Sequence, residues 1–180
     1  MTTYSTISSL LVVLALVASN AFGCSAVGKN TTVSGFIMDN FCIDMGTLLD
    51  KPEVKTLEHP ELHSIHCLVD VKSCVNSKYV VLAPSNGSLY TVAYNLDVAT
   101  TGILKTMAEA ARKAGGVQGF AATLTGIDDG TSELKCPSIS SVVMVDGKSM
   151  TLAAGTTSTA QTAVLTSLVA MVAVTRFIAQ

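Results

Sequence analysis

The sequence has no tryptophan, few charged side chains and none of the common short motifs of enzyme active sites. Charged residues make up 13% of the chain, and its eleven lysines and arginines are outnumbered by thirteen aspartates and glutamates. Because no basic stripe occurs, the sequence predicts no nucleic-acid partner. It also contains no CxxC pair, GxSxG elbow, HExxH helix or phosphate-binding loop, which mark redox, hydrolytic, metalloprotease and nucleotide-binding enzymes. These absences favour a binding role over catalysis.

Charge is absent from the first 26 residues, where an apolar run is followed by small residues. Residues 10–18 are uniformly apolar, and "SNAFGCSA" follows them at positions 19–26. Such a run before a small-residue cleavage site is typical of a secretory signal peptide, although only the Met1 amine supplies the usual positive charge. Residues 1–26 are therefore predicted to direct export.

The C-terminal segment, 155–180, shows the pattern of an anchor signal. Small residues at 153–155 precede the polar stretch "TTSTAQT" and the apolar stretch "AVLTSLVAMVAV", an order typical of a glycolipid (GPI) anchor signal. A short membrane segment is the alternative, although Arg176 interrupts the apolar run before the roughly 20 residues that a span needs. Both interpretations predict a domain at the extracellular face of the plasma membrane, and a secreted protein is the remaining option.

The residues between these ends, 27–154, are enough for a single domain. They contain an even number of cysteines, and export to an oxidising compartment predicts that these form disulfides. The four cysteines are Cys42, Cys67, Cys74 and Cys136. Two sequons, beginning at Asn30 and Asn86, predict glycans on surface loops.

The apolar periodicity of this region predicts a mainly β fold with one or two helices. Strands are predicted at 31–39, 78–84, 88–94, 118–127 and 138–145, and a helix at 98–114. Three strands, a helix and two strands is the element order of a five-stranded OB-like barrel. An open antiparallel sheet with the helix packed on one face is the alternative. The long connection 40–76 between the first two strands is the predicted functional loop.

Within that loop, "HPELHSIHCLVDVKSC" contains all three histidines of the chain and two of its cysteines. Pro60 is suited to begin a helix, and a helix from there places His63, Cys67, Asp70 and Cys74 on one face. Seven helical residues rise about 10.5 Å, too far for a disulfide between Cys67 and Cys74. Each must then pair with Cys42 or Cys136, and the preferred pairing is Cys42–Cys74 with Cys67–Cys136, pinning the loop to the barrel.

The same segment offers a possible metal site. Imidazoles three or four residues apart on a helix can bind zinc or copper, and a carboxylate one turn further can join them or orient them. The candidate ligands are His59, His63, His66 and Asp70. Copper, zinc, iron and haem are the candidate cofactors. The competing interpretation is that the disulfides only staple a small exported domain and the histidines lie on its surface.

A group of acidic residues near the same loop is a weaker candidate. Asp39, Asp44 and Asp50 offer carboxylates for acid–base chemistry, but turn and capping roles explain them more simply.

Two patterns in this region resemble an exported domain of algae-like eukaryotes for which no activity is established. They are the opening G-x-x-x-D-x-x-C, which matches 35–42, and H-S-x-H-C-L-V-D-V, which matches 63–71. The resemblance extends from Ser34 to about Val145 and implies one structural unit, without implying a reaction or a ligand.

Together these features predict a non-enzymatic binding or recognition domain that is secreted or held at the cell surface. Its extracellular ligand is not identified by the sequence, and the C-terminal segment is its predicted link to the membrane. A surface metal- or haem-binding protein that uses residues 59–66 is the alternative.

Overall fold

The computed structural model describes residues 25–85 and 89–152. The predicted signal peptide as far as residue 24, the sequon at Asn86 and the predicted anchor segment 155–180 lie outside these residues. Asn30, the other sequon asparagine, is exposed on the first strand. Within the described part of the chain, no helix is both long enough and apolar enough to cross a membrane.

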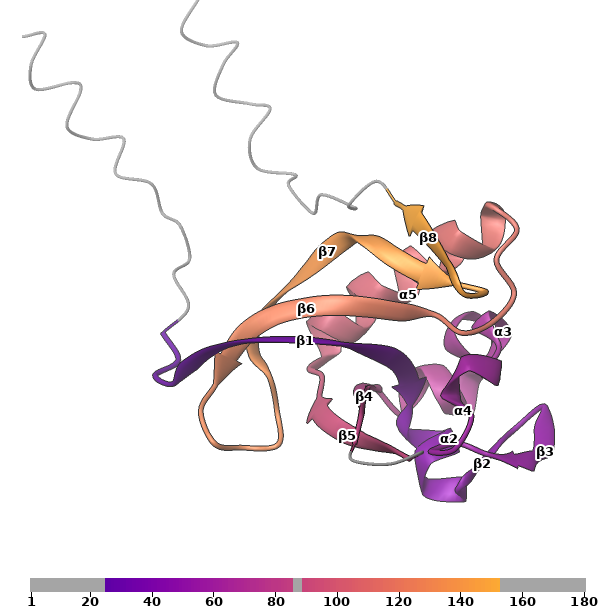
Figure 1. The fold of residues 1–180 in the computed structure, drawn as a ribbon, viewed down its shortest axis with the longest axis horizontal. Helices are drawn as coiled ribbons and strands as arrows, with labels where there is room; N and C mark the ends of the chain where they lie inside the picture. The colour runs from indigo at the N-terminus through magenta and orange to yellow at the C-terminus, as the bar shows by residue number, and fades with distance from the viewer. Residues whose placement is uncertain (1–24, 86–88, 153–180) are drawn as a thin grey trace, which may run out of the picture.

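The main structure is an antiparallel sheet of six strands in the order β5-β4-β1-β6-β7-β8 (Figure 1). Its strands are β1 (Lys29–Asp39), β4 (Tyr79–Pro84), β5 (Tyr90–Asn95), β6 (Ala121–Asp128), β7 (Lys135–Val145) and β8 (Lys148–Thr151). A separate hairpin joins β2 (Thr47–Leu48) to β3 (Lys51–Lys55). The helices are α2 (Asn40–Met45), the 3-10 turn η2 (Pro60–Leu62), α3 (Ile65–Val69), α4 (Lys72–Asn76) and α5 (Val98–Lys113).

The central strand, β1, changes partners along its length. Its first part pairs with β6, where Val33 is opposite Leu124, and its last part pairs with β4, where Phe36 is opposite Leu82. Gly35 precedes this second pairing, and a Cβ at Gly35 would lie 1.9 Å from the carbonyl oxygen of Leu82. Only glycine allows the two backbones to approach so closely.

The predicted OB-like barrel is wrong, because the sheet remains open. The edge strand β5 meets the β6–β7 connection at a single parallel bridge, Asn95 to Glu133, where the Asn95 amide donates to Ser132 O at 2.7 Å. A closed barrel would need β5 to pair with β7. One edge of β7 pairs with β6, and its other edge is occupied by β8. The alternative, an open antiparallel sheet with a helix packed on one face, is confirmed.

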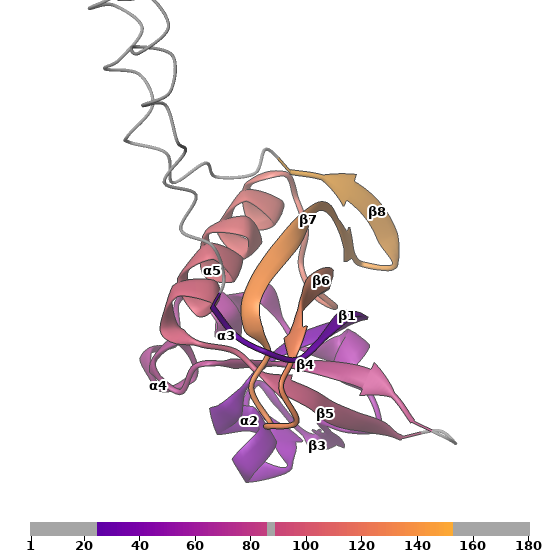
Figure 2. The same cartoon turned by 90° about the vertical axis from the view of Figure 1, so that its left-hand side faces the viewer.

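The helix on that face is α5, which lies along the sheet (Figure 2). Asp97 caps it by accepting from the Thr100 amide at 2.7 Å. The predicted apolar stripe is buried against the sheet, where it joins Val33, Ile37 and Tyr79 in the larger core. The stripe consists of Leu104, Met107, Ala108 and Ala111. Burying this stripe against the sheet stabilises the larger core.

The opposite face of β1 and β4 packs against a second cluster, to which the short helices α2, α3 and α4 each contribute a cysteine; these helices gather at one end of the sheet (Figure 1). Helix α3 also packs against α5, because its Ile65, Leu68 and Val69 belong to the larger core. Met38, Val80 and Leu82 point into this second cluster, whereas Ile37 and Val81 point toward α5. Four successive residues of β4 are therefore buried, as expected for a strand covered on both faces. The second cluster also contains Cys42, Cys67 and Cys74.

The predicted continuous helix from Pro60 is wrong. The chain forms η2, then extends through His63 and Ser64, and only then forms α3 and α4. The extended stretch is paired with another segment, because Ile65 N donates to Val117 O at 2.8 Å and Gly119 N donates to His63 O at 2.9 Å. This tertiary pairing competes with helix formation, and it turns His63 toward the interior.

Candidate metal centre

Asp39 begins the site at the end of β1. Its backbone is extended, and its Oδ1 atom accepts from the amide of Cys42 at 2.9 Å, which caps α2. An aspartate in this position satisfies an amide that the first helical turn leaves unpaired. The cap also fixes Cys42 in the first turn of α2, where its side chain is completely buried.

His63 approaches the same carboxylate from the extended segment before α3. Its ring nitrogen Nε2 lies 2.9 Å from Asp39 Oδ2, and the histidine side chain is only 2% exposed. With Nε2 engaged by Asp39, Nδ1 is the ring nitrogen left for another partner. One buried carboxylate therefore contacts both the histidine and the helix that carries Cys42.

The three buried cysteines occupy the same position in three short helices. Each is the third residue after the N-cap: Cys42 follows Asp39, Cys67 follows Ser64, and Cys74 follows Val71. Ser64 accepts from the Cys67 amide at 3.4 Å. The repeated geometry turns each sulfur inward from the first turn of its helix, so that three separate chain segments deliver thiols to one cluster.

These side chains form two overlapping groups of ligand atoms. Cys42, His63 and Cys67 offer atoms that all lie within 4.8 Å of one another, and so do Asp39, Cys42 and Cys74. Cys42 belongs to both groups. All five residues are buried, and apolar side chains of the second cluster surround them. The site is therefore closed to bulk solvent and electrostatically strong.

The contact between His63 and Asp39 shifts the pKa of both groups. Burial by itself would lower the pKa of His63, but the hydrogen bond to Asp39, helped by Cys67, raises it to about 9. Burial would likewise raise the pKa of Asp39, but the hydrogen bond and charge of His63 hold it below 3.8. The pair is thus an imidazolium and a carboxylate at neutral pH.

The cysteine pKa values diverge within the cluster. The hydrogen bond from the Cys42 thiol lowers the pKa of Cys67 to about 5, and His63 adds to this effect against the cost of burial. The same bond to Cys67, together with burial, raises the pKa of Cys42. Burial, then the charge of Asp39, raises the pKa of Cys74 to about 12. The hydrogen bond between the two thiols therefore makes Cys67 the more acidic cysteine of the pair and Cys42 the less acidic one.

The structure does not bring together the four predicted metal ligands His59, His63, His66 and Asp70. Of these four, only His63 belongs to one of the potential metal-binding groups found among the described residues. His59 bonds Glu61 at 2.9 Å and His66 bonds Asp70 at 2.8 Å, and both histidines are more than half exposed. Asp70 also bonds Arg112 of α5. Because the chain is extended at His63 and Ser64 and not helical, the three histidines do not share the helical face on which the predicted ligand set depended.

Cys42, Cys67 and Cys74 are free thiols in this structure, so neither predicted disulfide, Cys42–Cys74 or Cys67–Cys136, is present in it, although the sulfurs of Cys42 and Cys74 lie within 4.8 Å of each other. Cys136 lies exposed on β7, whereas Cys67 is buried in the second cluster. The prediction paired only Cys74 with Cys42 and placed Cys67 with Cys136. Instead, Cys67 and Cys74 both share a cluster with Cys42.

Asp39 was predicted only as part of a weak acidic group, and its meeting with the three thiols was not predicted. Asp44 and Asp50, grouped with Asp39 by sequence, are both exposed. Asp50 still lies near the cluster, with its Oδ1 atom 3.9 Å from the sulfur of Cys67. The signal that was available is the spacing of a polar residue three positions before a cysteine, D-x-x-C at 39–42 and S-x-x-C at 64–67, which is a capping pattern.

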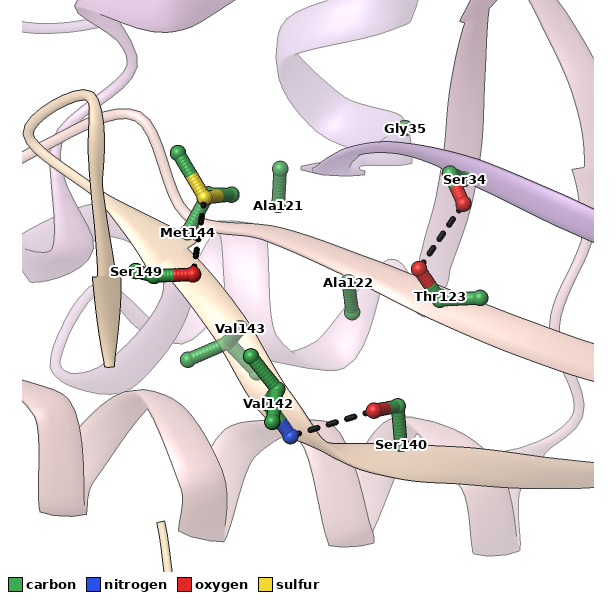
Figure 3. Close-up of a pocket in the computed structure, with 10 residues that line it drawn as sticks. All are labelled: Ser34, Gly35, Ala121, Ala122, Thr123, Ser140, Val142, Val143, Met144 and Ser149. Atoms are coloured by element: carbon green, nitrogen blue, oxygen red, sulfur yellow. Dashed lines mark hydrogen bonds between the residues drawn. The ribbon is translucent and has the colours of Figure 1, made fainter. Parts of the chain in front are cut away.

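A shallow pocket on the outer face of the sheet is a weaker candidate. It has a volume of about 280 Å³, and Figure 3 shows Ser34, Thr123 and Met144 among the side chains that line it. The hydroxyls of Ser34 and Thr123 bond each other at 2.8 Å. No charged side chain is among its lining residues, so it offers neither acid–base chemistry nor a charged anchor for a ligand.

The pKa shifts predict an unusual pH profile for the reduced, metal-free protein. Because the pKa of His63 is raised, its stabilisation is complete below pH 6.5 and is lost as pH rises through about 9. Because the pKa of Cys67 is lowered, its stabilisation is present above pH 9.0 and is lost as pH falls through about 5. Because the pKa of Asp39 is also lowered, its contribution to stability is likewise lost as pH falls below the ordinary aspartate value of 3.8.

Between pH 6.5 and about 9 the contributions of His63 and Cys67 oppose each other. We therefore expect the free energy of unfolding to be nearly constant there, and to fall below pH 6.5 by about 1.4 kcal/mol per pH unit. In Cys67→Ser only the histidine contribution remains, so stability should instead fall as pH rises through this range. Denaturant titrations across the range measure both profiles. A wild-type stability that declines steadily toward pH 9 would show that Cys67 retains its proton.

Comparison with known protein families, with curated proteins and with solved structures finds no match for this chain. The function of the buried cluster is therefore inferred from its own geometry and chemistry.

Proposed function

We propose that this domain binds a zinc or copper(I) ion through Cys42, His63 and Cys67. The observation that carries the proposal is the approach of these three ligand atoms to within 4.8 Å of one another inside the protein. Two sulfurs and an imidazole are soft or borderline ligands, which suit zinc and copper(I) better than magnesium or calcium. Cys74, whose sulfur lies within 4.8 Å of that of Cys42, is a candidate for a fourth ligand.

Asp39 supports this proposal as a positioning residue. Metal-bound histidines commonly donate their second ring N–H to a carboxylate, which fixes the ring and increases its basicity. The 2.9 Å contact between His63 Nε2 and Asp39 Oδ2 is of this kind. Asp39 also caps the helix of Cys42, so the same carboxylate positions two of the three ligands.

The burial of the cluster favours a closed centre that holds the ion without exposing it to a substrate. Catalytic zinc sites keep one coordination position open to water or substrate, whereas structural sites are closed. His63 is 2% exposed and the cysteines are completely buried. A haem would need an open face beside its axial histidine, so the cluster favours a bare ion. The proposed centre thus follows the alternative expectation, a surface metal-binding protein, with a different ligand set, and its location at the cell surface stays a proposal.

Metal titration of the reduced full-length chain tests the proposal. Wild type should bind one zinc ion, and His63→Ala should weaken binding by more than the 10–100-fold that loss of an outer partner costs. Cys67→Ser should behave similarly. The matched controls are His59→Ala and His66→Ala, which remove exposed imidazoles and should bind as wild type does.

Cobalt substitution adds a spectroscopic readout, because cobalt bound by thiolates gives charge-transfer absorption that should disappear in Cys67→Ser. Copper(I) is measured separately by competition with a chelator. Equal binding by His63→Ala and His66→Ala would overturn the proposed centre.

A further inference from the structure

Cys42 occupies a distinctive place among the three buried sulfurs. It lies within 4.8 Å of Cys67 in one group and within 4.8 Å of Cys74 in the other. Cys67 and Cys74 share neither group. They belong to successive short helices, α3 and α4, whereas Cys42 comes from α2 at the end of β1. Two pairs of sulfurs are therefore close, Cys42 with Cys67 and Cys42 with Cys74, and Cys42 belongs to both pairs.

We propose that Cys42 is the hub of a thiol–disulfide switch, meaning the cysteine shared by every disulfide of the cluster, and that forming such a disulfide abolishes metal binding. Oxidation joins Cys42 either to Cys67 or to Cys74, and never joins Cys67 to Cys74 directly. The regulatory half of this inference rests on the proposed metal centre, whereas the choice of sulfurs follows from their placement alone. Because the number of sulfurs is odd, one thiol of the cluster remains after either bridge forms.

A hydroperoxide supplies the oxidising equivalents. One cysteine sulfur attacks a peroxide oxygen, the O–O bond breaks, and with hydrogen peroxide the product is a sulfenic acid and water. The second sulfur then attacks the first, the S–O bond breaks, and a second water leaves. In total, two thiols and one hydrogen peroxide give one disulfide and two waters, with two electrons passing from the sulfurs to the peroxide.

Among the contacts of the cluster, that of Cys67 with an exposed side chain favours it as the first sulfur to meet a small oxidant. The sulfur of Cys67 lies 3.9 Å from Asp50 Oδ1, and Asp50 is exposed. Cys67 is therefore covered by a thin layer at this point, even though its own side chain is buried. This places the first attack at Cys67 or, through it, at the neighbouring Cys42.

Either bridge removes ligands from the metal centre, because a disulfide sulfur is no longer a thiolate ligand. A Cys42–Cys67 bridge removes both sulfurs of the proposed ligand set, and a Cys42–Cys74 bridge removes one. Conversely, a bound ion occupies the sulfurs that oxidation would join. Metal binding and bridge formation are therefore mutually exclusive, so protein that peroxide has already oxidised should not bind the ion.

Peptide mapping of the full-length chain tests the hub directly. Trypsin cleaves after lysine except before proline, so Cys42, Cys67 and Cys74 fall on separate peptides, 30–55, 56–72 and 73–78. The reduced, metal-free protein is treated with hydrogen peroxide, alkylated and digested. We expect peptide 30–55 linked to one or both of the others. Cys42→Ser should form no bridge within the cluster, whereas Cys67→Ser and Cys74→Ser should each retain one.

Zinc binding is measured on the same samples. Oxidised wild type should lose zinc binding and regain it after reduction, and zinc added first should protect the thiols. A bridge between peptides 56–72 and 73–78, or a bridged cluster in Cys42→Ser, would overturn the hub. If Cys42→Ser does not fold, as circular dichroism would show, the bridge map of wild type still decides. Reduced wild type that binds no zinc would refute the proposed metal centre and its control by oxidation. The peptide map separately tests whether Cys42 is the cysteine shared by the disulfides.

Discussion

Replacing Asp39 by alanine is expected to lower the free energy of unfolding of the metal-free protein by about 3–5 kcal/mol. The substitution leaves His63 buried without its carboxylate, although the two groups now lie 2.9 Å apart and almost fully excluded from water. Removing one member of a buried ion pair is costly because the remaining charge keeps its desolvation penalty. Loss of the cap on Cys42 N is part of the same cost, at about 0.5–2 kcal/mol.

The matched control is Asp97→Ala, which removes a capping aspartate that has no buried histidine partner. Asp97 caps α5 through the Thr100 amide at 2.7 Å, and its loss should cost only about 0.5–2 kcal/mol. Asp39→Asn retains a capping side chain and removes only the charge, so it should fall between the two. Chemical denaturation measures all three. If Asp39→Ala cost no more than Asp97→Ala, the pair with His63 would contribute nothing beyond capping.

Zinc addition is expected to have the second large effect. Free zinc at about 100–1,000 times its Kd should stabilise the reduced protein by about 2.7–4.1 kcal/mol. The reason is that the ligands come from two segments, one with Cys42 and one with His63 and Cys67, which the unfolded chain does not hold together. Binding then stabilises only the folded state. Thermal unfolding should shift upward by on the order of 10 °C, and a chelator should reverse the shift.

Two controls separate this effect from nonspecific binding. His63→Ala should show little stabilisation by zinc, because it lacks the buried imidazole, whereas His66→Ala should respond as wild type does. Protein oxidised by peroxide beforehand should also fail to respond. Stabilisation of equal size in His63→Ala would mean that zinc binds elsewhere, and it would contradict the proposed ligand set.

The regular elements were predictable because their signals are local. The helix at 98–114 was expected from its apolar stripe and is found as α5 (Val98–Lys113). The strand at 78–84 was expected from β-branched residues and is found as β4 (Tyr79–Pro84). Each pattern repeats within a few turns or pleats, so neighbouring residues are sufficient to specify it. Closure of the sheet is a different kind of property, because it depends on which strand pairs with the free side of β7.

The histidine segment shows why local patterns failed at the site. The spacing of His59, His63 and His66 predicted a shared helical face, but the backbone at 63–65 pairs with 117–119 instead. That pairing involves residues more than fifty positions away, which no helical periodicity can reveal. It turns His63 inward to Asp39 and leaves the other two histidines with exposed carboxylate partners.

The sequence by itself determined the strand and helix segments, the capping spacings D-x-x-C and S-x-x-C, and the single long connection in which the chemistry is concentrated. Only the tertiary structure decided that the sheet stays open and that Asp39, Cys42, His63, Cys67 and Cys74 meet. The physical reason is distance along the chain. Capping and periodicity are interactions among near neighbours, whereas the cluster depends on bringing one cysteine from each of three short helices to the face of β1 and β4 that α5 leaves uncovered.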